Sequence, residues 1–262
     1  MRFGEIYRFN NNLTILGRMG YFFYGYPFIG GYLRSLYFKH LLKSVSFLTA
    51  LDAGCGAGEY SFYLAKKFPR ATIDAIDKNI DFNYTDYLLK KTGLKNINFI
   101  KKDILEVNDF DKYDLIFSID VLEHIGLNQS ALEKLYNTLK PGGRLIIHLP
   151  QKEWDRVRFF DPKYFTSFNK FIKEEHPGQV YDANELSELL IKIGFQIKRL
   201  QQTFGILGKL AWEIDQLFLE KKLYFLKILS LPFLKILCQL DTIVEHKHGS
   251  GVIILAAKIN KN

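Results

Sequence analysis

Cysteine is scarce in this chain, and continuous apolar runs are missing. Only Cys55 and Cys238 occur among 262 residues, so a disulfide framework is excluded and a reducing compartment is favoured. Residues 1–13 lack the apolar core of a signal peptide. The apolar stretches 19–33 and 223–240 are interrupted by Gly, Pro or Lys, which argues against a spanning helix. We therefore expect a cytoplasmic protein.

Acidic residues are absent between Glu5 and Asp52, although the whole chain carries 28 of them against 36 Lys and Arg. The same segment is rich in Tyr and Phe, and its cations are Arg8, Arg18, Arg34, Lys39 and Lys43. A basic aromatic segment can contact nucleic acid, an anionic membrane surface or an acidic substrate. It can equally be a solvated face combined with core aromatics. The composition leaves these alternatives open.

From about residue 48, short apolar runs alternate with longer segments of helical periodicity. This alternation predicts an α/β fold: a Rossmann-like, seven-stranded, mostly parallel sheet with helices on both faces. The predicted strands are 47–53, 71–77, 97–103, 113–120, 144–150, 196–203 and 251–259. The predicted helices are 59–68, 81–93, 130–143 and 183–195. In such sheets, ligands bind beyond the carboxyl ends of the strands.

Three segments fall outside this alternation. Residues 1–47 are predicted to form an aromatic and basic helical cap, ahead of a catalytic domain at 48–262. Residues 151–181 and 204–249 are insertions in that domain, and we expect them to form helical additions on the acceptor side, that is, a lid.

The stretch LDAGCGAGEY, residues 51–60, is a glycine-rich turn after an apolar run. It is not a dinucleotide fingerprint, because the sixth position counted from Gly54 is Glu59, and the lysine of a P-loop is absent. A carboxylate in the first turn of the following helix would repel a phosphate there. The loop therefore suits a nucleoside that carries positive charge, such as S-adenosylmethionine.

Further polar residues lie where successive strands end. Gly54, Gly56 and Gly58 allow a close backbone approach, and Asp52 precedes them. Asp77 can accept hydrogen bonds from both ribose hydroxyls. After the next two strands, Asp103 can reach the adenine amine with Ile104 against the ring, and Asp120 lines the same crevice. Each of these carboxylates could instead cap a turn or helix.

The motifs LDAGCGAGEYS, AID, KKDI, FDKYDLIFSIDVLEHI and LKPGGRLIIHLP occur in this order along the chain. As a set they resemble class I S-adenosylmethionine-dependent methyltransferases, in particular the small-molecule, type 11-like branch with LEH after the fourth strand. The resemblance covers about residues 48–203 and the last strand. It implies that Asp52, Gly54, Gly56, Asp77, Asp103, Ile104 and Asp120 hold the cofactor.

Methyl transfer from a sulfonium depends mostly on positioning, with a base where the acceptor must lose a proton. His124, in the LEH motif, and His176, which the resemblance pairs with Tyr181, are the candidate catalytic residues. Each could instead be structural. His148 is more readily explained as a core histidine, and Glu123 is a weaker candidate. We expect no metal, because no His/Cys cluster has zinc-ligand spacing.

The acceptor is expected to be small. SIDVLEH lacks the Asp/Asn-Pro-Pro-aromatic pattern of nucleic-acid amino methyltransferases, and neither cysteine follows a proline. The apolar insertions favour a lipophilic or lipid-linked acceptor methylated on a hydroxyl or activated carbon, such as a quinone precursor, lipid or surface-glycan intermediate. Residues 204–240 could contact the inner face of the membrane, pack on the protein's own core, or form a homodimer. An RNA or DNA methyltransferase and a non-catalytic cofactor-binding scaffold stay as alternatives.

Overall fold

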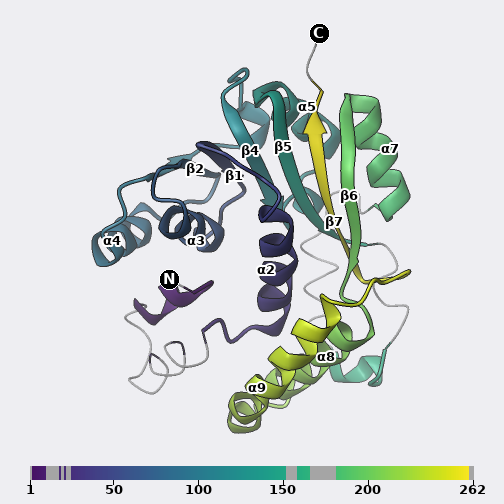
Figure 1. Ribbon diagram of the computed structural model, residues 1–262. Helices are drawn as coiled ribbons and strands as arrows, with labels where there is room; N and C mark the ends of the chain where they lie inside the picture. Colours follow the sequence, from purple (N-terminus) through teal and green to yellow (C-terminus); the bar gives the residue numbers. More distant parts are fainter. Residues whose placement is uncertain are drawn as a thin grey trace.

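The computed structural model describes residues 2–9, 18, 21, 25–151, 158–165 and 181–259. Within them the strands form one sheet in the order β3-β2-β1-β4-β5-β7-β6 (Figure 1). β7 is antiparallel to β5 and β6, and the other pairs are parallel. The strands are β1 (Thr49–Ala53), β2 (Thr72–Asp77), β3 (Ile97–Lys101), β4 (Tyr113–Ile119), β5 (Leu139–Pro150), β6 (Phe195–Thr203) and β7 (Gly251–Lys258). This confirms the predicted seven-stranded, mostly parallel sheet.

Helices cover both faces of the sheet. α3 (Glu59–Lys67) and α4 (Phe82–Thr92) pack on one face, and α5 (Asn128–Thr138) and α7 (Ala183–Ile193) pack on the other. Successive residues of a strand point to opposite faces. In β7, Ile253 belongs to the core under α3, whereas Ile254 belongs to the core under α5 and α7. Both faces are therefore apolar, as buried parallel strands require.

Local sequence signals explain most helix boundaries, with one correction. Asp182 and Glu185 form a capping box at the start of α7. The helix predicted at 130–143 instead ends at Thr138, and Leu139 already pairs with Tyr113 of β4. Proline disfavours the helical conformation in the residue before it, so Lys140 cannot extend the helix ahead of Pro141.

Helices from the segments 1–47 and 204–249 form a second helical layer that adjoins the carboxyl ends of the strands. α2 (Ile29–Leu42) packs against α8 (Ile206–Glu220), α9 (Tyr224–Asp241), β5 and β7. Figure 1 shows α8 and α9 side by side beyond the end of β6. No helix of the described residues is long and apolar enough to cross a membrane. That this layer acts as a lid stays a prediction.

Two fully buried carboxylates join α2, α8 and α9. Asp215 in α8 is paired with Lys227 of α9 and accepts a hydrogen bond from the main-chain N–H of Ile29 (3.4 Å). Asp241, at the end of α9, accepts from the Tyr37 hydroxyl (2.9 Å) and from the N–H groups of Gly205 (3.2 Å) and Gly208 (2.8 Å). Asp241 thus caps the start of α8 from another helix and fixes the layer to α2.

We expect Asp241→Ala to lower the free energy of unfolding by roughly 3 kcal/mol, because it leaves several buried donors unsatisfied. Urea denaturation of both proteins measures the difference. Glu106→Ala, at an exposed position in a short 3-10 helix, is the control and should stay near the wild type. Equal losses in the two variants would contradict the role assigned to Asp241.

Candidate functional site

The glycine-rich turn lies between β1 and α3 and is held against β2. The N–H groups of Gly54 and Cys55 both donate to the carbonyl of Ile76 at 2.9 Å. Gly54 has φ +89°, and a Cβ there would lie 2.4 Å from Val121, so the position requires glycine. Gly56 has φ +51°, but a Cβ there would meet nothing within 4 Å. The turn is therefore packed at Gly54 and opens onto free space at Gly56.

Two of the predicted carboxylates lie beside this turn. Asp77, the last residue of β2, accepts hydrogen bonds from the N–H groups of Gly56 (3.0 Å) and Asn79 (2.8 Å). Asp52 is almost fully buried in β1 and accepts from the hydroxyl of Ser61 in α3 (2.7 Å). Burial raises the pKa of Asp52 to about 7, although the Ser61 hydrogen bond opposes this shift.

Asp103 and Ile104 follow β3 at the same edge of the sheet. The Asp103 side chain accepts from the N–H of Leu105 (2.9 Å) and caps the 3-10 helix Ile104–Glu106. Ile104 is buried in the core under α5. Asp103 therefore caps a turn in the structure, as the alternative interpretation predicted. A contact with adenine would be a second role of the same side chain.

Asp120 is the centre of a polar network at the end of β4. It has φ +53°, unusual for a residue other than glycine. Its carboxylate forms an ion pair with Arg34 of α2 (2.6 Å) and a hydrogen bond with Nδ1 of His148. Burial by itself raises the pKa of Asp120. The combined effect of Arg34 and His148 is larger and lowers the pKa to about 2. His148 also bonds Thr203 of β6 through Nε2 (2.9 Å), so both of its ring nitrogens are engaged.

Glu59, in the first turn of α3, meets the N-terminal segment. It accepts hydrogen bonds from the hydroxyls of Tyr7 and Tyr26, the latter at 2.9 Å. Burial raises the pKa of Glu59, and the tyrosines and Arg34 only partly offset this effect. The rings of Tyr7, Tyr21 and Tyr26 lie together, with centroids 5.8 Å apart in each pair that includes Tyr7.

The candidate bases differ in how the structure presents them. His124 is half-buried in the short 3-10 helix Leu122–His124, and its charge contributes to the lowered pKa of Asp120. Glu123 is buried, and its Oε2 has no hydrogen-bond partner among the described residues. Burial and the nearby Asp120 raise the pKa of Glu123 well above its usual range. His176 lies outside the described residues.

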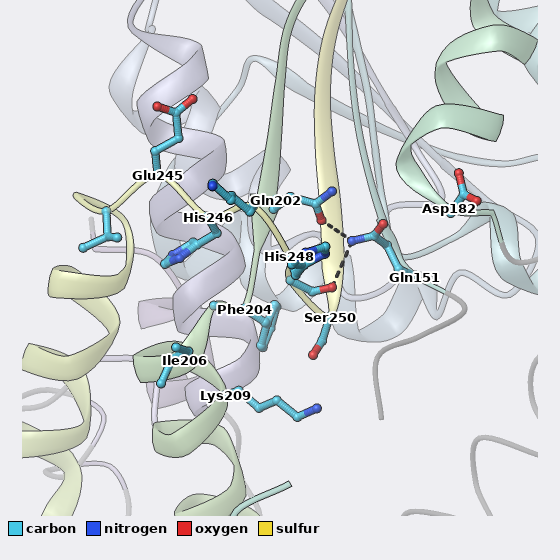
Figure 2. A pocket seen from close by; sticks show the side chains of 14 residues that line it. Gln151, Asp182, Gln202, Phe204, Ile206, Lys209, Glu245, His246, His248 and Ser250 are labelled. Atoms are coloured by element: carbon cyan, nitrogen blue, oxygen red, sulfur yellow. Dashed lines mark hydrogen bonds between the residues drawn. The ribbon is translucent and has the colours of Figure 1, made fainter. Parts of the chain in front are cut away.

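A cavity of about 430 Å³ lies at the same edge of the sheet, beyond β6 and β7 (Figure 2). Its wall combines apolar, basic and acidic side chains, among them Phe204, Ile206, Val244, Lys209, His246, His248, Asp182 and Glu245. Gln151 closes one side and donates to the carbonyl of Gly249 (3.0 Å). Within the described part of the chain, no group of three His, Cys, Asp or Glu side chains is arranged to hold a metal ion.

Sequence reasoning did not single out Arg34, Tyr7 or Tyr26. These residues come from the N-terminal segment, far from the motifs in sequence, and reach Asp120 and Glu59 only through the fold. The available signal was the absence of acidic residues between Glu5 and Asp52. A cation in a buried apolar helix needs a partner, and no acidic residue of its own segment could provide one.

Comparison with known proteins relates this geometry to enzymes. Residues 45–210 match the family described as "Methyltransferase domain". The chain is 29% identical over 188 residues to a ubiquinone biosynthesis O-methyltransferase of Rickettsia prowazekii, covering 68% of this chain and 70% of the relative. It is 37% identical over 138 residues to malonyl-[acyl-carrier protein] O-methyltransferase 2 of Ilyobacter polytropus, covering 50% and 52% of the two chains.

Solved structures share the fold. A SAM-dependent methyltransferase from Aquifex aeolicus superposes with TM-score 0.53 at 21% identity, covering 84% of this chain and 89% of that one. Phosphoethanolamine N-methyltransferase 2 of Haemonchus contortus, crystallised with S-adenosyl-L-methionine, superposes with TM-score 0.62 at 19% identity, covering 99% and 60%. At these identities the likeness concerns the fold.

Asp52→Asn tests the charge state of the site. The pKa of Asp52 is about 7 in the fold against 3.8 for the free residue, so the stability gained by its acid form is lost as pH rises toward 7. Between about pH 5 and pH 8, the unfolding free energy of the wild type should fall by on the order of 2 kcal/mol more than that of Asp52→Asn. Urea denaturation at both pH values measures this.

Asp86→Asn, on the exposed side of α4, is the matched control for Asp52→Asn and should keep the pH dependence of the wild type. If Asp52→Asn also keeps it, Asp52 is ionised in the folded protein and the site is less apolar than its burial indicates.

Proposed function

The chain belongs to the family of S-adenosylmethionine-dependent methyltransferases, and we propose that it transfers the methyl group to a hydroxyl or activated carbon of a small, lipophilic or lipid-linked acceptor. The observation that supports this proposal best is the position of the apolar helices α8 and α9, which stand at the ligand-binding edge of the sheet next to the cavity.

The charges around the glycine-rich turn fit the cofactor. Residues 52–60 include two carboxyl groups and no Lys or Arg. Burial raises the pKa of both Asp52 and Glu59, and no Lys or Arg within this stretch offsets the shift. A sulfonium and an ammonium would supply positive charge, and Gly56 leaves space for a ligand close to the backbone. A phosphorylated nucleotide would be repelled.

We assign the cofactor contacts accordingly. The turn from Gly54 to Gly58 would face the cofactor with its backbone, Asp77 would accept from the ribose hydroxyls, and Asp103 with Ile104 would contact the adenine. Asp120 would hold the end of β4 against α2 and β5 through Arg34 and His148. The bound cofactor supplies an already activated methyl group, so these residues contribute mainly orientation.

The acceptor must lose a proton if it is a hydroxyl, and His124 is the base we propose among the described residues. It is half-buried in the 3-10 helix Leu122–His124 that follows β4, at the edge of the sheet where Asp120 lies. His176 stays a second candidate. Glu123 is kept in its acid form by burial and is less suited to remove a proton.

Two contacts make nucleic acid the second choice despite the basic N-terminal segment. Arg34 is paired with Asp120, and Lys39 lies over the rings of Phe3 and Tyr63 at 5.2 and 5.0 Å. Burial lowers the pKa of Lys39 to about 8. Cations that bind phosphates point into solvent and keep a full charge. The O-methyltransferases among the relatives further support an oxygen acceptor.

Asp77→Ala should weaken the binding of S-adenosylhomocysteine roughly 10- to 100-fold, because it removes a charged acceptor of hydrogen bonds. Isothermal titration calorimetry measures the affinity without any acceptor. Asp86→Ala, on exposed α4, is the matched control and should bind like the wild type. Unchanged binding in Asp77→Ala would remove Asp77 from the cofactor site.

The acceptor class is tested with methyl-labelled S-adenosylmethionine and a membrane-containing lysate of the source organism. After incubation, the label is separated into organic-extractable, water-soluble, nucleic-acid and protein fractions. We expect label in the organic fraction, and a decrease of roughly 100-fold or more for His124→Gln, because a general base contributes about this much. Cofactor affinity of His124→Gln should stay unchanged.

Label in the nucleic-acid fraction would replace the proposed acceptor class. Label in no fraction, with cofactor still bound, would favour the scaffold alternative. Full transfer by His124→Gln would leave His176 as the candidate base.

A further inference from the structure

α9 has an apolar face that no other described element covers. Phe225, Leu229, Phe233, Ile236 and Leu240 are spaced by three or four residues, so they lie along one side of the helix, and all are exposed. We call this set the α9 stripe. Its length is about 22 Å at 1.5 Å per residue. The opposite side, with Leu234 and Cys238, is buried against the rest of the helical layer.

The charged side chains of the segment that carries the α9 stripe are all lysines. Residues 221–240 include no acidic residue and four lysines. Lys227 is buried with Asp215 and Lys235 lies over the ring of Tyr32, but Lys221 and Lys222 are exposed just before α9. An apolar surface bordered by lysines is typical of helices that lie in the plane of a membrane containing anionic lipids.

The far end of the stripe reaches the cavity of Figure 2. Ile243 and Val244 follow Thr242, the C-cap of α9, and are exposed, and Val244 lines the cavity. Charged groups of both signs in the cavity wall, Lys209, His246 and His248 with Glu245, lie next to this apolar end. When the α9 stripe lies in the plane of a membrane surface, the cavity at its end is therefore close to that surface.

We propose that the α9 stripe docks the protein on a membrane surface containing anionic lipids, with the cavity open at the level of the lipid head groups. This membrane contact goes beyond the methyl transfer proposed above, and its test does not require turnover. A second copy of the chain fits the stripe less well, because residues 221–240 carry four lysines and no acidic residue that could pair with the lysines of another copy.

The test is flotation of the full chain with two kinds of vesicles, phosphatidylcholine alone and an equimolar mixture with phosphatidylglycerol. The wild type should float with the mixture and much less with phosphatidylcholine, and added salt should release it. The double variant Phe225→Glu/Phe233→Glu should bind the mixture at least ~100-fold more weakly, because two exposed aromatic side chains no longer enter the apolar layer.

Phe110→Glu is the matched control. Phe110 is 74% exposed, close to the 78% of Phe225, but lies in the loop before β4. It should bind vesicles like the wild type. Lys221→Glu/Lys222→Glu should lose roughly tenfold or more of the affinity for the mixture and should make the two vesicle types more alike.

The proposal is overturned if the wild type floats with neither vesicle, if lipid charge makes no difference, or if Phe225→Glu/Phe233→Glu binds normally. It is also overturned if light scattering finds a dimer that this variant dissociates while vesicles are not bound, since the stripe would then join two copies. Calorimetry with S-adenosylhomocysteine on the same samples keeps this result separate from a failure of the proposed methyl transfer.

Discussion

The pairing of Asp120 with Arg34 and His148 connects the sheet with the added helical layer. Asp120 lies where β4 ends, next to the glycine-rich turn, whereas Arg34 belongs to the added helix α2 and His148 to β5. Asp120 adopts a left-handed backbone conformation that costs an ordinary residue about 1 kcal/mol, and its contacts offset that cost. His148 extends the network to Thr203, from which the chain enters α8. The positions of α2 and α8 therefore depend on the end of β4.

Acidic groups outnumber their cations around the glycine-rich turn. Arg34 lowers the pKa of Asp120, but burial dominates at Asp52, Glu59 and Glu123, and their pKa values are raised. An enzyme that binds a nucleoside carrying a sulfonium and an ammonium gains from this arrangement, because these cations favour the ionised form of carboxyl groups that burial otherwise keeps protonated. Cofactor binding and proton release are linked for the same reason. The short supply of cations thus favours the sulfonium cofactor over nucleotide phosphates.

The sheet was predictable because its signals are local. Apolar runs, the Asp182–Glu185 capping box and the glycine-rich turn each define their element from neighbouring residues, and the order of motifs placed Asp52, Asp77, Asp103 and Asp120 at one edge. The start of β5 was missed because the restriction that Pro141 imposes on Lys140 outweighs the helical pattern before it. Arg34, Tyr7 and Tyr26 were missed for another reason: their partners are 86, 52 and 33 residues away, and only tertiary packing brings them together.

The place of the α8–α9 insertion follows from the direction of β7. Because β7 is antiparallel to β6, the connection between them starts and ends at the same edge of the sheet, and Thr203 pairs with Gly251 there. That edge is where the parallel strands β1, β2 and β4 end and where a ligand binds. A segment inserted at this connection does not interrupt any strand, and it lies at the ligand-binding edge. The apolar insertion at this connection therefore lies at the ligand-binding edge of the sheet, while the residues proposed to hold the cofactor come from other connections.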